Sequence, residues 1–219
     1  MLRKRLVVLL AGVVVVVAPV FSGAAAAVVA PAASTARAMA ADSPEATIDA
    51  LDAALLKAMQ GGSRIGYSGR YRIVAPVVQR VFDYSRIASL TLGSYWSKLS
   101  PGQQKEFVGV LADYTAATYA ARFDSDSGAR FAIVSTQTLH PGTEGVFSTF
   151  TERNGKVHRF VYLLQKQDGR WGIVNVVADG VSDLSLKRAE YTETMKNKGF
   201  SALVAHLRKQ IAGYAKGAH

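Results

Sequence analysis

The sequence predicts an α+β protein in which N-terminal helices precede a four-stranded antiparallel meander and further helices follow it. Apolar residues recur at helical spacing over residues 42–125, and alternating strand-like patterns cover residues 130–178. Helical spacing returns from Ser182 onward. Because the chain contains no internal repeat and no long linker, we expect residues 41–219 to form a single domain.

Residues 1–40 are expected to be an export signal peptide. Arg3, Lys4 and Arg5 form a positive start, an apolar stretch follows, and Ala38-Met39-Ala40 fits an A-x-A cleavage site. An uncleaved membrane anchor is the alternative, because no charge occurs over residues 6–33. In both cases the positive end stays inside, so we expect the remainder to lie in the periplasm.

Composition narrows the class of protein. Four of the 26 basic residues and none of the 16 acidic residues precede Asp42, so the remainder has 22 basic and 16 acidic residues, a net charge of +6. This excess suits anionic head groups or an acidic partner surface, although a plain basic bias explains it equally well. Nucleic acid is a poor fit for an exported protein. The chain has no cysteine, which excludes disulfides and thiolate metal sites.

Capping residues and glycines divide the first helical region. Ser43 and Pro44 are typical of a helix start, and Gly61-Gly62 is expected to end that helix. Pro76 is expected to mark a kink or a break in the next helix.

The remaining helices have equally clear ends. Asp83 is expected to cap a short helix that ends at Gly93, and Ser100 with Gln103 forms a capping box at the start of the strongest helix. Beyond the sheet, Gly199 separates two further helices. The strongest helix carries one apolar stripe: Phe107, Leu111, Tyr114 and Thr118.

Two turns predict the register of the meander. Asn154-Gly155 and Asp168-Gly169 are both signals of a two-residue type I′ hairpin. Counting outward from them places Phe147 opposite Tyr162, Tyr162 opposite Asn175, and Leu164 opposite Ile173.

One face of this sheet is then wide and aromatic, with a few polar groups. It collects Phe147, Thr149, His158, Phe160, Tyr162, Leu164, Trp171, Ile173, Asn175 and Val177. The other face is also apolar, so both faces need cover. Apolar walls with a few polar groups are typical of a small-molecule cavity, and a sheet packed between two helical layers is the alternative that this pattern leaves open.

Catalytic motifs are missing from the sequence. It has no G-x-S-x-G nucleophile turn, no H-E-x-x-H, and no glycine-rich phosphate-binding motif. We therefore predict no catalytic residue, no cofactor and no metal site. His158 with Asp179 is the one pair that could serve an enzyme acting on a lipid.

The order and spacing of several short motifs are similar to those of the MlaC family, the toluene-tolerance phospholipid-binding proteins. The matching runs are Ala75-Pro76-Val77-Val78, Phe82-Asp83-Tyr84, Leu92-Gly93-Ser94-Tyr95-Trp96, Leu99-Ser100-Pro101, Trp171-Gly172-Ile173-Val174-Asn175-Val176, Asp179-Gly180-Val181-Ser182, and Arg188 with Tyr191 before Gly199. Tyr119-Ala120-Ala121-Arg122-Phe123-Asp124 resembles the hopanoid-associated HpnM branch. The resemblance covers most of residues 45–213.

The resemblance implies a periplasmic shuttle that holds the acyl chains of a lipid in an apolar cavity between sheet and helices. The implied cargo is a phospholipid or a hopanoid, and the implied partner is an inner-membrane lipid transporter. Two other functions remain open: a periplasmic enzyme with a lipid in a cone-shaped pocket, and a lipid-free adaptor of a transport complex.

The candidate lining residues come from the sheet face and the helical stripe. Thr149, Tyr162 and Asn175 are the candidates to orient the polar end of a lipid. The apolar candidates are Phe147, Phe160, Tyr162, Leu164, Trp171 and Ile173 on the sheet, with Phe107, Leu111 and Tyr114 as the opposite wall.

Overall fold

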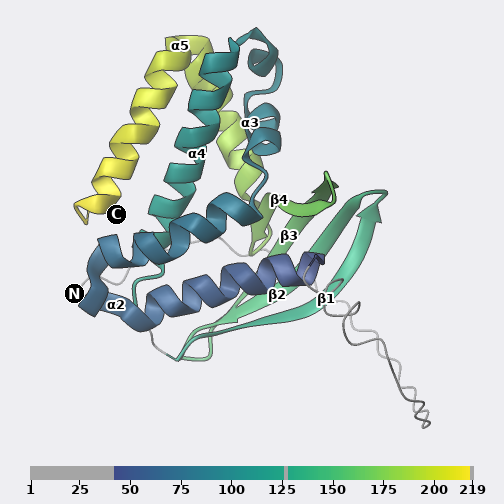
Figure 1. Ribbon diagram of the computed structural model, residues 1–219, viewed down its shortest axis with the longest axis vertical. Coiled ribbons are helices and arrows are strands. Elements are labelled where there is room, and N and C mark those ends of the chain that lie inside the picture. Colours follow the sequence, from purple (N-terminus) through teal and green to yellow (C-terminus); the bar gives the residue numbers. More distant parts are fainter. Residues whose placement is uncertain (1–41, 126–127, 218–219) are drawn as a thin grey trace. The chain divides into compact units, whose positions relative to one another are not determined.

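Helices precede and follow one antiparallel sheet, as the sequence predicts (Figure 1). The computed structural model describes residues 42–125 and 128–217, so the expected signal peptide at residues 1–40 lies outside the described residues. The elements are α2 (Pro44–Val81), α3 (Tyr84–Leu92), the 3-10 helix η1 (Gly93–Lys98), α4 (Pro101–Arg122), β1 (Arg130–His140), β2 (Thr143–Thr151), β3 (Val157–Gln167), β4 (Arg170–Ala178), β5 (Val181–Ser182) and α5 (Asp183–Ala215). Within these ranges, no helix is both long enough and apolar enough to cross a bilayer.

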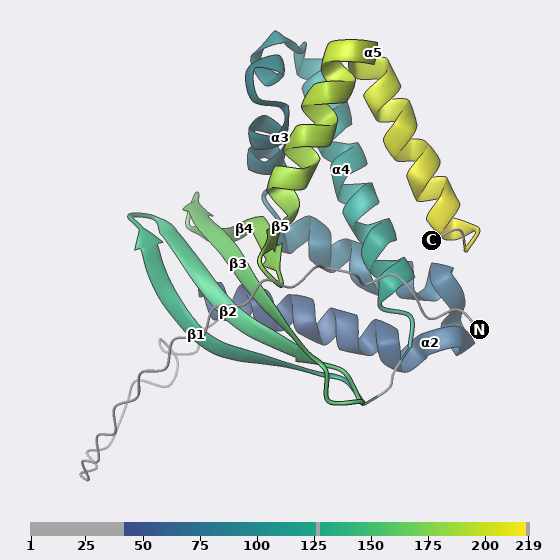
Figure 2. The ribbon, with the colours of Figure 1, turned by 180° about the vertical axis from the view of Figure 1, so that it is seen from behind.

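The sheet has the strand order β1-β2-β3-β4-β5, and each strand is antiparallel to its neighbours. The four predicted strands are confirmed, and β5 is a two-residue addition that pairs with the end of β4. In the view from behind, β1, β2 and β3 lie in front of α2, and no helix among the described residues lies over their near face (Figure 2).

The helix α2 bends sharply at two glycines. Gly62 and Gly66 have φ values of 50° and 60°, which residues with a Cβ atom rarely adopt. The buried guanidinium of Arg70 holds this bend against α4, because it donates to the carbonyl oxygens of Gly62 (3.0 Å) and Ala120 (2.7 Å). The helix continues through Pro76, so of the two alternatives predicted there the break is wrong.

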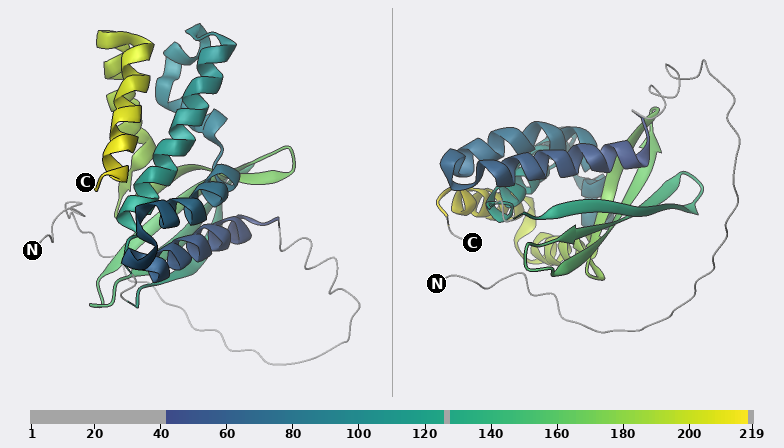
Figure 3. Two further views of the ribbon diagram at one scale, coloured as in Figure 1. Left: turned by 60° about the vertical axis from the view of Figure 1, so that its left-hand side comes forward. Right: turned by 90° about the horizontal axis from the view of Figure 1, so that it is seen from below.

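The first segment of α2, residues 44–61, lies across one face of the sheet (Figures 1 and 3). Its N-terminus has the predicted cap, since the Ser43 hydroxyl accepts from the backbone N–H of Ala46. The buried residues Ile48, Leu51 and Leu55 join the same hydrophobic cluster as residues of the sheet. This segment is therefore the helical cover of the sheet face that it crosses.

The helices α3, α4 and α5 form a separate layer beyond β4 (Figure 1). The connection before α3 pairs with β4, where the Asp83 N–H donates to the Ile173 carbonyl over 3.0 Å. Gly172 permits this approach, because a Cβ atom there would lie 3.0 Å from that of Asp83. The predicted capping box at Ser100 is confirmed, and α5 folds back at Gly199 into a helical hairpin.

Candidate functional site

The face of the sheet that packs against α2 is called the inner face below. Its residues follow from the strand pairing and from alternation along each strand. They are Val146, Ser148, Phe150, His158, Phe160, Tyr162, Leu164, Trp171, Ile173 and Val176. The predicted set Phe160, Tyr162, Leu164, Trp171 and Ile173 therefore does lie on one face, and Leu164 does pair with Ile173.

The predicted positions of Phe147 and Thr149 are wrong. Asn154 and Gly155 lie in a three-residue loop, which the Glu152 N–H closes by donating to the Lys156 carbonyl over 2.8 Å. A two-residue type I′ turn needs positive φ at both central residues, and here only Gly155 has it. The register of β2 therefore shifts by one residue, Val146 instead of Phe147 pairs with Tyr162, and every β2 side chain changes face.

Asn175 also lies on the outer face, because the pairing of β3 with β4 is irregular between Leu163 and Leu164. Asn175 consequently pairs with Leu163, and Val176 takes the predicted place opposite Tyr162. The Asn175 side-chain oxygen accepts from the Ser182 hydroxyl and the Leu184 N–H, both at 3.2 Å. Asn175 thus holds the start of α5, and it does not face the interior with Tyr162.

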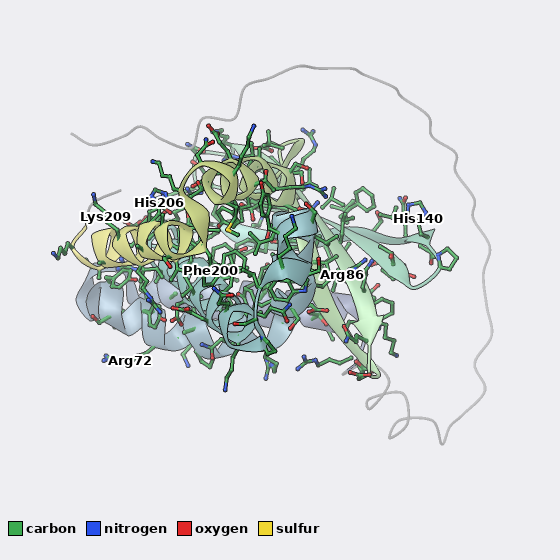
Figure 4. All side chains as sticks on the ribbon, turned by 90° about the horizontal axis from the view of Figure 1, so that it is seen from above. Arg72, Arg86, His140, Phe200, His206 and Lys209 are labelled. Carbon is green, nitrogen blue, oxygen red and sulfur yellow. The ribbon has the colours of Figure 1, made fainter. Side chains whose placement is uncertain are left out.

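The wall opposite the inner face is the first segment of α2 and not the predicted α4 stripe. Phe107 packs against α5, with its ring 5.9 Å from that of Tyr191 and 6.3 Å from that of Phe200. Figure 4 shows Phe200 among the helices. The Tyr114 ring packs against that of Tyr214 at a tilt of 48°, and Leu111 is buried in the same helical layer. The stripe is apolar because it packs one helix onto another, a role that periodicity alone does not distinguish from a cavity wall.

Five aromatic residues join the end of α4 to the sheet. None of them is among the lining residues predicted from the sequence. This aromatic seam consists of Phe82, Tyr119, Phe123, Phe131 and Phe150. Phe123 is central, with its ring 5.7 Å from Tyr119 and 5.9 Å from Phe150. Phe82 and Phe123 follow the last residue of a helix, so helical periodicity gives no signal for them.

The interior between α2 and the inner face also contains polar groups. Asp52 lies between Leu51 and Leu55 on the buried side of α2, and only 6% of its surface is exposed. Burial, with the charge of Asp49 as a second cause, raises the pKa of Asp52 to about 7. Burial also raises the pKa of the inner-face residue Tyr162. The sequence did contain a signal for Asp52: it lies four residues after Ile48, at a spacing where the predicted helix carries buried apolar residues.

The structure does bring His158 and Asp179 together, but as a clamp of three residues. The His158 Nδ1 lies 2.7 Å from an Asp179 carboxylate oxygen, and its Nε2 lies 2.8 Å from a Glu152 oxygen. The second oxygen of Asp179 accepts from the Arg159 N–H over 2.8 Å. With both ring nitrogens engaged, His158 has no nitrogen free to take a proton from a substrate.

The electrostatics of the clamp are those of a structural link. The hydrogen bond from His158 holds the pKa of Glu152 below its usual value. Burial raises the pKa of Asp179, but hydrogen bonds from His158 and the Arg159 N–H outweigh it, and the net pKa is below the usual value. The clamp joins the loop before β3 to the turn after β4, and this link stabilises that end of the sheet.

Fold and site together define an α+β protein whose sheet and leading helix enclose an apolar, aromatic interior with isolated polar groups. Residues 49–209 match the family model described as MlaC protein, and the chain belongs to this family. The match identifies the family and no branch of it, so membership of the HpnM branch stays a prediction.

A solved structure shares this fold. It is a phospholipid-binding protein from Ralstonia solanacearum in complex with a phospholipid. The two chains are 20% identical with a TM-score of 0.64, and the similarity covers 78% of this chain and 97% of the other. The predicted fold class is thereby confirmed.

Proposed function

We propose that this protein is a periplasmic carrier that binds a phospholipid in the interior between α2 and the inner face and moves it between membranes. The observation that carries the proposal is the apolar, aromatic character of this interior: Phe160, Trp171 and Tyr162 belong to one hydrophobic cluster, together with Phe123 and Phe131 of the aromatic seam. The MlaC family match and the phospholipid in the similar Ralstonia structure support the same function.

The energetic argument explains why such a carrier is useful. Each methylene group exposed to water costs about 0.8 kcal/mol, so a lipid with about 30 methylenes faces roughly 24 kcal/mol before compensation. Diffusion of free lipid through an aqueous space is negligible at that cost. Apolar walls remove most of it without any directional chemistry, so the proposed function requires no catalytic residue.

The entrance is proposed to lie where large apolar side chains reach the surface. Phe160 and Trp171 are only half-buried although both pack against the core. The net charge of +6 after Ala41 favours approach to anionic head groups and membranes. We propose an inner-membrane lipid transporter as the partner that loads or unloads the carrier.

Purified protein is expected to contain bound phospholipid, to be measured by organic extraction and mass spectrometry. Phe160→Asp places a charge in the lining and is expected to lower the lipid recovered per protein by about tenfold. Phe147→Asp is the matched control, because Phe147 is also a half-buried phenylalanine but lies on the outer face. It is expected to retain lipid at the level of the unmodified protein.

Circular dichroism establishes that both variants are folded before their lipid is compared. Recovery of no lipid from the unmodified protein would contradict the carrier function. Equal lipid loss in both variants would contradict the location of the binding space, and lipid loss confined to Phe147→Asp would move that space to the outer face.

A further inference from the structure

Two buried polar groups in the interior lack a hydrogen-bond partner among the described residues. They are the Asp52 Oδ1 atom on α2 and the Ser148 hydroxyl on β2. Ser148 is 2% exposed and belongs to the inner face, where it pairs with Phe160. Buried polar atoms are almost always paired in folded proteins, so unpaired groups on two facing walls need an explanation.

Asp52 lies on the side of α2 that packs against the inner face, because its buried neighbours Leu51 and Leu55 belong to the same hydrophobic cluster as Tyr162. Tyr162, 3% exposed, is diagonal to Ser148 on the inner face, because Val146 pairs with Tyr162 and Ser148 with Phe160. After burial, the negative charge of Asp52 is the second cause that raises the pKa of the Tyr162 hydroxyl. Asp52 therefore lies on the buried side of α2 that packs against a region of the sheet with two hydroxyl groups, those of Ser148 and Tyr162.

Packing alone gives no reason for a carboxyl group in this place. Its neighbours along the buried side of α2 are Ile48, Leu51 and Leu55, and a leucine here would avoid the cost of burying an acid. Among the described residues, no basic side chain forms an ion pair with Asp52. A partner from outside the chain is the remaining way to complete its hydrogen bonds.

The chemistry of the group defines that partner. Ionised, a carboxyl group only accepts hydrogen bonds and repels a phosphate; neutral, it both donates and accepts. A hydroxyl group can hydrogen-bond to the carboxyl group in both its ionised and its neutral form. An ammonium group is a good partner only for the ionised form, which apolar surroundings disfavour. A hydroxyl group can also bond to Ser148 and Tyr162.

We propose that Asp52, with Ser148 and Tyr162, forms a polar subsite inside the lipid-binding space that binds a hydroxyl group on the buried part of the cargo. This inference rests on the proposed carrier function and defines its cargo more narrowly. The expected cargo is a lipid whose enclosed part carries a hydrogen-bond donor as well as hydrocarbon.

The test compares dodecanol with dodecyl methyl ether, in which a methyl group replaces the hydroxyl hydrogen and removes the donor, in titrations of the delipidated protein. We expect dodecanol to bind about tenfold more tightly than the ether. Asp52→Leu is expected to abolish this difference while still binding both probes. Asp52→Asn retains an acceptor oxygen and is expected to keep the preference. Asp168→Asn, in the exposed turn between β3 and β4, serves as the control and is expected to leave the affinity for both probes unchanged.

Equal affinity of the unmodified protein for the two probes overturns the subsite and leaves the carrier function standing. So does a preference that persists in Asp52→Leu. Tighter binding of dodecylammonium than of dodecanol overturns the hydroxyl assignment in favour of a cation. Failure of every probe to bind, with no lipid in the purified protein, overturns the subsite together with the carrier function.

Discussion

Replacing Leu164 with aspartate is expected to lower the free energy of unfolding by about 4–5 kcal/mol. The side chain is fully buried on the inner face, so the variant loses the burial of a leucine and places an unpaired carboxyl group in the core. That loss is comparable to the whole stability of many domains, so a large unfolded fraction is expected at 37 °C.

Leu163→Asp is the matched control, because it makes the same change one residue earlier in β3. Leu163 is half-buried on the outer face, where a carboxylate can reach water, and a loss of about 1 kcal/mol is expected. Urea unfolding followed by circular dichroism measures both variants. Equal losses would contradict the assignment of the two faces.

Replacing His158 with alanine is expected to cost about 2 kcal/mol, because it removes two hydrogen bonds to carboxylates and leaves both acids facing an empty space. This loss of stability is smaller than for a fully buried ion pair, because the Glu152 and Asp179 side chains are 32% and 31% exposed and water can hydrate them in the variant. His140→Ala is the control at an exposed site, at the end of β1 that enters the β1–β2 hairpin (Figure 4), and it is expected to change little.

The cost of His158→Ala is also expected to depend on pH. The folded-state pKa values of Glu152 and Asp179 lie below their usual values of 4.5 and 3.8. Groups with lowered pKa values stabilise the folded state above their usual values, and this stabilisation disappears as the pH falls through the lowered values. The difference in the free energy of unfolding between the unmodified protein and His158→Ala should therefore be largest at pH 6 and decrease below about pH 4.

Unfolding curves at several pH values measure this difference. A cost that is constant from pH 6 to pH 3 would show that His158 acts by packing alone. In that case the clamp would contribute no electrostatic link between the two turns.

The sequence alone determined the elements whose signals are local. The caps at Ser43 and Ser100 and the break at Gly199 lie where predicted, because each depends on a hydrogen bond or a backbone conformation within a few residues. The Asp168-Gly169 turn also has the predicted type, since both residues adopt positive φ. Enough of the chain follows these rules that the fold class could be predicted before any coordinates. The MlaC family was predicted from a resemblance in the order and spacing of short motifs, and the family match confirms it.

Only the tertiary structure decided which side chains share the interior. The three-residue loop at Gly155 and the irregular pairing beside Leu164 each shift a strand by one residue, and a shift of one residue exchanges the two faces. The apolar stripe of α4 packs against α5, while α2 with Asp52 covers the sheet. Such choices depend on contacts between segments far apart in the chain, and the local periodicity is the same whichever partner a face meets.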